Sequence, residues 1–220
     1  MAKKYGGRWE IIDGPRLGDG GQGTVFRVRD ITGQLDGEFA LKRVLDISRR
    51  DRFRRQVEAI KRLTDPETHQ AHPNVISLID HSALDEDQDT EKQFLVMPIA
   101  EGGDLSAPGR LSLYKDSIDT VLQVAKQLTA ALIAAHAVQI IHRDVKPKNI
   151  LFTGNGHETW LSDFGICLLR EAPRITETPE VMGPRAFMAP ELEDGGQLDV
   201  TPAADIYSLG KVIITCSQAA

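Results

Sequence analysis

The sequence predicts an α+β fold in two lobes, a small β-rich lobe followed by a mainly helical one. Short runs rich in β-branched and aromatic residues, bounded by Gly, Asp or Pro, dominate residues 1–97. From Ser117 onward, apolar residues recur with helical spacing instead. The pattern changes near residues 98–103, so we expect the lobes at residues 1–97 and 98–220.

The β-rich lobe is expected to contain five strands and one helix. The strands are the short runs at residues 11–12, 24–28, 39–44, 75–79 and 94–97. The helix is predicted by four apolar residues at helical spacing, namely Phe53, Val57, Ile60 and Leu63. We expect a loop at residues 64–71 and a solvated hairpin tip at the acidic residues 84–92.

The helical lobe is expected to begin with a long core helix. Its continuous apolar stripe comprises Val121, Val124, Ala125, Leu128, Ala131, Leu132 and Ala135. His136, near the end of this helix, is expected to pack rather than to bind a ligand. A last helix is expected at about residues 203–217.

Composition limits the class of protein. The 220 residues suffice for one large domain or two lobes, and the net charge of −6 argues against nucleic acid as the main partner. Two cysteines, Cys167 and Cys216, imply no disulfide framework and fit a reducing cytoplasm. We expect neither a signal peptide nor a membrane segment, because no apolar run follows the first lysines and no long apolar stretch occurs.

The most informative motif is HRDVKPKN at residues 142–149, followed closely by Asp163 of a DFG tripeptide. Phosphoryl transfer needs a carboxylate near the attacking hydroxyl, a cation near the moving phosphoryl group and oxygen ligands for Mg²⁺. Asp144 and Lys146 can supply the first two. Asn149 and Asp163 can supply the ligands.

A hairpin would bring these two ligands together. The gap between Asn149 and Asp163 accommodates a strand at residues 150–152, a glycine-rich turn and a second strand at residues 159–161. We therefore expect Asn149 and Asp163 to lie side by side at its open end.

With MAPE at residues 188–191, these motifs resemble those of the protein kinase family, and most closely the bacterial Ser/Thr kinases of eukaryotic type. The resemblance runs from about Trp9 to the last residue. It implies that Asp144 orients the acceptor hydroxyl and takes its proton, while Lys146 neutralises charge on the γ-phosphoryl group. Asn149 and Asp163 would hold Mg²⁺. Lysine two positions after the aspartate is the pattern of Ser/Thr kinases, so a protein Ser or Thr hydroxyl is the expected acceptor.

Residues 17–25, LGDGGQGTV, match the pattern G-x-G-x-x-G-x-V of a phosphate-covering loop. The same glycines would suit a Rossmann turn, but a Rossmann turn requires a helix directly afterwards. Residues 24–28 alternate like a strand instead, which favours the kinase loop.

The resemblance implies an ATP site around this loop. Lys42 would contact the α- and β-phosphates, Met97 falls at the gatekeeper position before the hinge, and Asp104 is placed to contact the ribose. The nucleotide-binding candidates are Leu17, Gly18, Gly20, Gly23, Val25, Ala40, Lys42, Met97, Ile99, Asp104, Leu151 and Asp163.

Two residues depart from the family pattern. The helix of the β-rich lobe should carry a glutamate that pairs with Lys42, but the matching position is Gln56, and Glu58 should face away. Pro184 stands where Ser/Thr kinases commonly place a threonine, which weakens the inference of Ser/Thr specificity.

The C-terminal lobe is also expected to be incomplete. The family's helical lobe normally continues with further helices, whereas this chain stops at Ala220. We expect apolar residues of the last helix to lose partners, and therefore marginal stability or self-association through that surface. The residues concerned are Ile206, Leu209, Val212, Ile213 and Ile214.

The activation segment, residues 163–191, contains Thr176 and Thr178. By resemblance, a phosphate on either threonine would pair with Arg143 and order the segment. The alternative is that both are ordinary exposed loop residues.

The sequence is thus interpreted as a cytoplasmic, ATP- and Mg²⁺-dependent kinase acting on protein Ser/Thr hydroxyls. The main alternative is an ATP-binding pseudokinase or interaction module with little turnover, which Gln56 and the incomplete lobe favour. A small-molecule phosphotransferase of related fold is disfavoured by the segment between the DFG and APE motifs.

Overall fold

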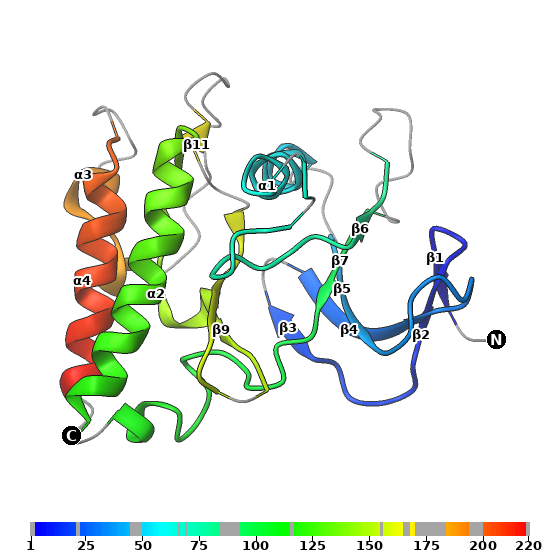
Figure 1. Ribbon diagram of the computed structural model, residues 1–220, viewed down its shortest axis with the longest axis horizontal. Helices are drawn as coiled ribbons and strands as arrows, with labels where there is room; N and C mark the ends of the chain where they lie inside the picture. The colour runs from blue at the N-terminus through cyan, green and yellow to red at the C-terminus, as the bar shows by residue number, and fades with distance from the viewer. Residues whose placement is uncertain are drawn as a thin grey trace.

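The computed structural model has two lobes (Figure 1). It describes residues 3–20, 23–44, 50–65, 67–68, 70–83, 93–114, 117–154, 156–164, 168–169, 184–193 and 200–218. An antiparallel sheet forms the N-terminal lobe, and two long helices, α2 (Ile118–Ala137) and α4 (Ala203–Gln218), stand at the opposite end of the molecule. The predicted α+β fold is confirmed.

The sheet of the N-terminal lobe has seven strands in the order β1-β2-β4-β5-β7-β6, with β3 paired to β4. The strands are β1 Lys4–Tyr5, β2 Trp9–Ile11, β3 Gly18–Gly20, β4 Gly23–Asp30, β5 Phe39–Arg43, β6 Asp80–His81 and β7 Phe94–Pro98. Side chains of one face, Trp9, Leu41 and Val96 among them, form a buried cluster. This sheet carries the glycine loop on β3 and β4 and Lys42 on β5.

Helix α1 (Arg50–Arg62) packs on the other face of the sheet. Phe53 and Val57 cluster there with Val44 and with Leu95, the β7 residue next to Val96. Alternation along β7 therefore serves two clusters, one on each face. The predicted helix is confirmed.

The predicted strand at residues 75–79 is wrong. Val75 makes only an isolated bridge to Leu161, and the strand β6 begins at Asp80. The start of this run bonds to the other lobe instead: Leu161 N donates to Asn74 O at 2.8 Å, and Ile76 N donates to Leu161 O at 3.1 Å. Its last residue, Ile79, donates from its backbone N–H to Val96 O of β7 at 2.8 Å. Val75 and Ile76 are consecutive and both buried, which a half-buried strand would not allow.

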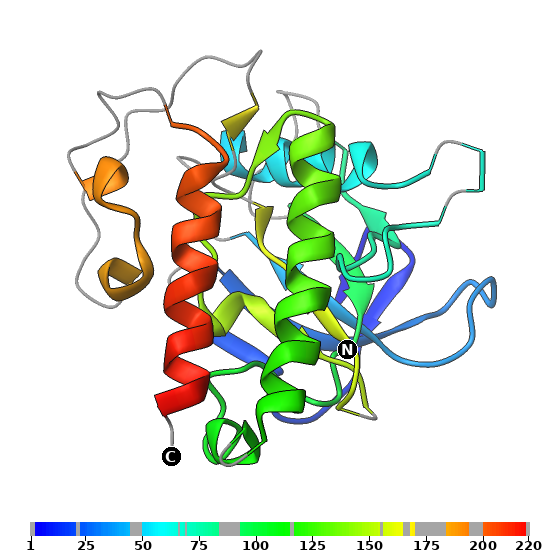
Figure 2. The same ribbon diagram turned by 60° about the vertical axis from the view of Figure 1, so that its left-hand side comes forward.

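The C-terminal lobe combines short strands and turns with α2 and α4. Its remaining elements are η3 Leu111–Tyr114, β8 Ile140–Ile141, η4 Pro147–Asn149, β9 Ile150–Phe152, β10 Thr159–Leu161, β11 Leu168–Leu169, η6 Pro184–Phe187 and α3 Pro190–Glu193. Figure 2 shows α2 and α4 packed side by side, and contacts between them agree. The predicted hairpin β9–β10 is present, with Ile150 opposite Leu161.

Helix α2 is the core helix that the apolar stripe predicts. Ser117 caps its start, because its Oγ accepts from Thr120 N at 3.4 Å. Within the described residues, α2 alone has the length and hydropathy of a membrane span, but its stripe is buried in the core of the C-terminal lobe. That same core includes Ala59 and Ile60 of α1, so it joins the two lobes.

The exposed face of α4 is narrower than expected. Leu209 and Val212 are buried and Ile213 packs against the core, so these three of the five apolar residues keep their partners. Ile206 and Ile214 are about half exposed, at 52% and 49%. The apolar surface is therefore confined to one edge of this helix.

Candidate active site

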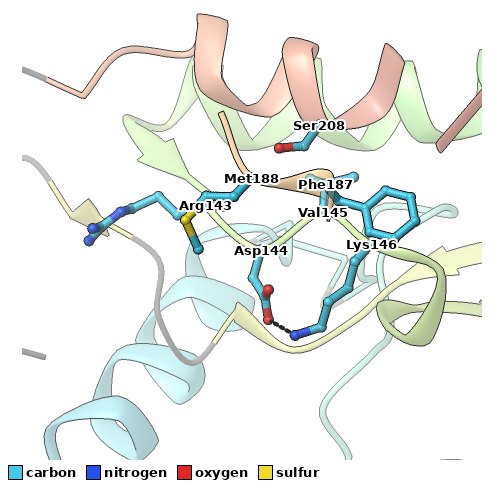
Figure 3. Close-up of a pocket in the computed structure, with 7 residues that line it drawn as sticks. All are labelled: Arg143, Asp144, Val145, Lys146, Phe187, Met188 and Ser208. Atoms are coloured by element: carbon cyan, nitrogen blue, oxygen red, sulfur yellow. Dashed lines mark hydrogen bonds and ion pairs between the residues drawn. The ribbon is translucent and has the colours of Figure 1, made fainter. Parts of the chain in front are cut away.

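The catalytic-type loop holds Asp144 between two donors. Lys146 Nζ donates to Asp144 Oδ2 at 2.7 Å (Figure 3), and Asn149 Nδ2 donates to the same oxygen at 2.9 Å and to the Asp144 carbonyl at 2.8 Å. Asp144 and Asn149 are buried, at 9% and 4% exposure. The loop thus fixes the direction of the Asp144 carboxylate without any contribution from a ligand.

Asp205, on the first turn of α4, anchors the backbone of this loop. Its carboxylate is fully buried and accepts the backbone N–H of His142 at 2.9 Å and of Arg143 at 2.8 Å. These bonds hold Arg143 at a φ of 66°, a conformation rare for a non-glycine residue. Sequence reasoning missed Asp205, although an acid on an apolar helix is a signal that it needs buried partners.

His136 also differs from its expected role. It lies 2.8 Å from Asp205 Oδ2 through Nε2, so it is a hydrogen-bonding residue of the loop anchor rather than a simple packing residue. Three donors thereby converge on one buried carboxylate, which offsets the cost of burying its charge.

His142 connects the catalytic-type loop to the DFG segment. Its Nδ1 accepts from Asp144 N at 3.2 Å, and its Nε2 donates to Ser162 O at 2.9 Å. Its ring meets Phe164 edge-on at 4.6 Å between centroids. The accepted bond at Nδ1 places the ring proton on Nε2.

The β9–β10 hairpin brings Asn149 and Asp163 to the same end, as predicted. Ser162 N and Oγ both donate to Asn149 O, at 2.9 and 3.0 Å, so the residue before Asp163 is bonded to Asn149 itself. The site residues come from adjacent positions of one rigid hairpin.

Asp163 forms an ion pair with Lys42 across the two lobes. Lys42 Nζ lies 3.0 Å from Asp163 Oδ2. Burial alone would raise the pKa of Asp163, but the charge and hydrogen bond of Lys42 outweigh it, with the charge of Lys146 adding to the effect, so the pKa lies below its ordinary range. Asp163 therefore carries a negative charge at neutral pH.

The residues at this end of the hairpin fit Mg²⁺. Both amide hydrogens of Asn149 are used by Asp144, which leaves its Oδ1 oxygen for a cation. Asp163 supplies an ionised carboxylate. Within the described residues, no three His, Cys, Asp or Glu side chains group as metal ligands. Two protein oxygens suit Mg²⁺, which keeps waters and binds substrate phosphates.

The described part of the glycine loop lies on the paired strands β3 and β4. Gly18 lies opposite Val25 and Gly20 opposite Gly23, and Leu17 N donates to Val25 O at 3.0 Å. Gly23 cannot carry a side chain, because a Cβ would lie 2.3 Å from Arg43 O. The tip residues 21 and 22 lie outside the described residues.

The strand register aligns the candidates for the nucleotide site. Val25 lies opposite Lys42, and Ala40 lies opposite Met97, so β4, β5 and β7 present them in neighbouring rows. The arrangement agrees with the pattern that predicted these residues, and their contact with adenine stays a prediction.

The linker after β7 brings Asp104 next to β9. Gly102 N donates to Phe152 O at 3.0 Å, and Asp104 bridges to Leu151, so the linker runs along β9. A Cβ on Gly102 would lie 2.6 Å from Thr153 O, which explains the glycine. The Asp104 carboxylate accepts from Ser106 N at 2.7 Å, and its role at a ribose, like the hinge role of Ile99, stays a prediction.

A comparison with protein families settles which fold this is. The family model described as protein kinase domain matches residues 12–219. The chain belongs to the protein kinase family.

Three curated relatives of this kinase-family chain are bacterial proteins. The DNA damage-responsive serine/threonine-protein kinase RqkA of Deinococcus radiodurans is 34% identical over 211 residues, which is 94% of this chain and 29% of RqkA. The serine/threonine-protein kinase PrkC of Bacillus subtilis is 33% identical over 222 residues, 97% of this chain and 31% of PrkC. PknA of Mycobacterium tuberculosis is 38% identical over 145 residues, 64% of this chain. The chain spans about a third of the length of these relatives.

The α1 position that the sequence predicts to face the site carries no charge. Gln56 is buried at 4% exposure, whereas the Glu58 side chain is 51% exposed and pairs with Arg62 at 2.6 Å. The helix register deduced from the sequence is therefore the one observed. Gln56 is the inward residue, and Glu58 belongs to the solvent side.

A small pocket adjoins Asp144, with Ser208 of α4 among its lining residues (Figure 3). Its lining residues are Arg143, Asp144, Val145, Lys146, Phe187, Met188 and Ser208. The catalytic-type loop forms one wall, and the segment just before the APE motif forms another. Pro184 begins η6 directly before this wall, and Thr176 and Thr178 lie outside the described residues.

Proposed function

We propose that this chain is an ATP-dependent protein Ser/Thr kinase that transfers the γ-phosphoryl group to a protein hydroxyl. The observation that carries the proposal is the Asp144 carboxylate, held by Lys146 and Asn149 and lining a pocket. The three bacterial relatives are all named as serine/threonine-protein kinases, which supports the acceptor class.

Each polar group of the site has one part in this proposal. Asp144 accepts the proton of the acceptor hydroxyl, and Lys146 neutralises charge on the phosphoryl group as it moves. Asn149 and Asp163 would hold Mg²⁺, which supplies charge neutralisation on the phosphate oxygens when bound. Lys42 would bind the α- and β-phosphates, together with backbone N–H groups of the glycine loop.

Arg143 supports a regulated activation segment. Within the described residues, its Nε is buried with no hydrogen-bond partner. A buried cationic donor without an acceptor is costly, so a phosphate on Thr176 or Thr178 would improve its environment.

Since kinases draw on cytoplasmic ATP and the chain implies no disulfide framework, we place it in the cytoplasm.

The second candidate is an ATP-binding pseudokinase or interaction module with little turnover. Gln56 favours it, because this neutral side chain cannot form an ion pair with Lys42. The complete set of Asp144, Lys146, Asn149 and Asp163 favours the enzyme.

One experiment separates these functions. The purified chain is incubated with γ-labelled ATP and a mixture of protein substrates, with and without Mg²⁺, and phosphorylated residues are identified by mass spectrometry. We expect Mg²⁺-dependent label on Ser and Thr. ATP binding without transfer would establish the pseudokinase, and label on Tyr alone would contradict the acceptor class.

A further inference from the structure

A side chain of α2, Gln127, bonds to the outer edge of the β9–β10 hairpin. Its Oε1 accepts from Thr159 N at 2.6 Å and from Thr159 Oγ1 at 2.8 Å. Its Nε2 donates to His157 O at 2.8 Å. Thr159 is fully buried, so the loss of this acceptor would leave its backbone N–H and hydroxyl unpaired in the interior. The Gln127 amide therefore bonds to β10 as a peptide unit of a neighbouring strand would.

The residues that follow α1 continue this edge. Asn74 O accepts from Leu161 N at 2.8 Å, and Ile76 N donates to Leu161 O at 3.1 Å. The Asn74 side chain also bonds back along the strand, because its Nδ2 donates to Thr159 O at 3.2 Å and to Gln127 Oε1 at 3.4 Å. The outward N–H and C=O groups of both β10 residues therefore have partners.

This edge lies close in sequence to the candidate magnesium ligands. Leu161 comes two residues before Asp163. Ser162, between them, donates from its backbone N–H to Asn149 O at 2.9 Å. Apolar residues of both strands also pack in the core of the C-terminal lobe, but such packing is non-directional, whereas hydrogen bonds need a defined geometry. The bonds of Gln127 therefore define where the hairpin lies along α2.

We infer that Gln127 is a positioning residue for the proposed magnesium site, acting through β10 on Asp163 and Asn149. The inference rests on the proposed function. Loss of the amide would let the hairpin shift against α2, so the two ligands would no longer hold the geometry that Mg²⁺ demands. Lys42 and the glycine loop belong to the sheet of the other lobe, so nucleotide binding without metal should not depend on Gln127.

Gln123 provides a matched control on the same helix. It lies about one turn before Gln127, is exposed, and donates to the same His157 O at 3.2 Å. Within the described residues it makes no bond to Thr159. Gln123→Met and Gln127→Met therefore make the same chemical change, but only the second removes the acceptor of Thr159.

The anchoring of β10 is tested without ligands, by hydrogen exchange of backbone amides. In Gln127→Met we expect the Thr159 N–H to exchange about 3- to 10-fold faster than in the unsubstituted protein. The N–H of Leu132, a buried residue of α2, should be unchanged. Gln123→Met should leave both amides as they were. Equal acceleration at both amides in Gln127→Met would show a general loss of stability and overturn the anchoring.

The positioning role is tested with a fluorescent ATP analogue, titrated with Mg²⁺ or kept in EDTA. In Gln127→Met we expect the Mg²⁺ concentration that gives half of the Mg²⁺-dependent gain in binding to rise about 3- to 10-fold. The affinity in EDTA should be unchanged, and Gln123→Met should keep both values. Thr159→Val removes only the hydroxyl that bonds to Gln127, so it should shift the Mg²⁺ value in the same direction, whereas Thr159→Ser should not. This second pair decides the matter if Gln127→Met folds poorly.

These outcomes separate the inference from the proposed function. No binding of the analogue by the unsubstituted protein, with or without Mg²⁺, would contradict the proposed function and the positioning role with it, while hydrogen exchange still decides the anchoring. Binding with an unchanged Mg²⁺ requirement in Gln127→Met, or an equal loss of affinity in Mg²⁺ and in EDTA, would overturn the positioning role alone.

Discussion

At the residue scale, this kinase-family site depends on a few buried polar side chains. Some of their hydrogen-bond partners lie in the same loop, and others are far apart in sequence. Asp144, Lys146 and Asn149 lie in one loop, and the motif predicted their roles but not the hydrogen bonds that join them. Asp205 and His136 bond to one another across 69 positions, and no local pattern predicts that contact. The sequence therefore predicted the residues of the site and the hairpin that joins Asn149 to Asp163, and the structure was needed for the hydrogen bonds of the loop and for its long-range anchor.

Gln56→Glu is expected to raise kinase activity. The new carboxylate faces inward from α1 and gives Lys42 a charge-assisted partner, roughly twice as strong as a neutral one. If this pair stabilises the conformation in which α1 lies close to Lys42 by about 1.4 kcal/mol, the equilibrium constant for that conformation rises about tenfold. The measurement is kcat for phosphoryl transfer. Glu58→Gln is the control and should change little; a loss of activity in that control, with Gln56→Glu neutral, would refute the account of α1.

Asp205→Asn is expected to lower both stability and activity. An asparagine side chain keeps one acceptor oxygen, but its NH₂ group replaces the other. That NH₂ group cannot accept a hydrogen bond from the backbone N–H groups of His142 and Arg143. Each buried donor left without a partner costs about 1–3 kcal/mol. Urea unfolding measures the loss, and His136→Ala, which removes a single donor from the same carboxylate, should cost less. Equal costs for the two variants would show that the backbone bonds do not depend on the charge.

At the element scale, the longer periodic segments were predictable and the two-residue strands were not. α1, α2, α4 and the β9–β10 hairpin were expected because each has its own periodicity or turn signal. Strands such as β1, β8 and β11 exist only through pairing with distant partners, so their sequences carry no such signal. Residues 75–79 failed in the opposite way: their apolar run resembles a strand, but its side chains are divided between clusters, with Val75 in the core of the C-terminal lobe and Ile79 against the cluster of the N-terminal sheet.

The N-terminal hairpin β1–β2 is fixed to the sheet by a polar cluster. Arg8 donates two hydrogen bonds to Asp30 Oδ2, at 2.9 and 2.7 Å, and stacks on Trp9. Trp9 Nε1 donates to Asp80 Oδ2 at 2.7 Å. The hydrogen bond from Arg8, helped by those from Thr32, lowers the pKa of Asp30 despite its burial.

Asp30→Asn is expected to make folding stability fall less steeply as the pH is lowered into the acid range. Because the pKa of Asp30 is lowered in the folded protein, its contribution is present above the unfolded value of about 3.9 and is lost as pH falls toward the folded value. The unsubstituted protein should therefore lose stability below about pH 4 more steeply than the variant. Melting temperatures of both proteins, measured at a series of pH values from neutral to below about pH 4, give the two slopes. Glu10→Gln, which removes the pair with largely exposed Arg29, is the control; an equally steep fall in Asp30→Asn would contradict the assignment.

At the scale of the whole molecule, one edge of α4 remains apolar and open. Ile206, Tyr207 and Ile214 are 52%, 42% and 49% exposed. Burying one such side chain is worth about 1.5–3 kcal/mol, a sizeable part of the stability of a typical domain. We propose that the 220-residue chain self-associates through this edge.

Sedimentation at several concentrations tests this association. The double variant Ile206→Ser, Ile214→Ser should shift the distribution toward monomer, whereas Ile31→Ser, an exposed apolar residue in the N-terminal lobe, should not. A chain that stays monomeric at all concentrations and melts cooperatively at an ordinary temperature would refute the proposal.

The most direct measurement of the central claim compares phosphoryl transfer and nucleotide binding in Asp144→Asn. Asp144 meets the acceptor hydroxyl in this account, whereas Lys42 and Asp163 meet the nucleotide and its metal. We predict that labelled phosphate transfer from Mg²⁺–ATP falls to background while the affinity for the fluorescent ATP analogue stays unchanged. Transfer that persists undiminished in Asp144→Asn would contradict the assignment of this site as the kinase active site.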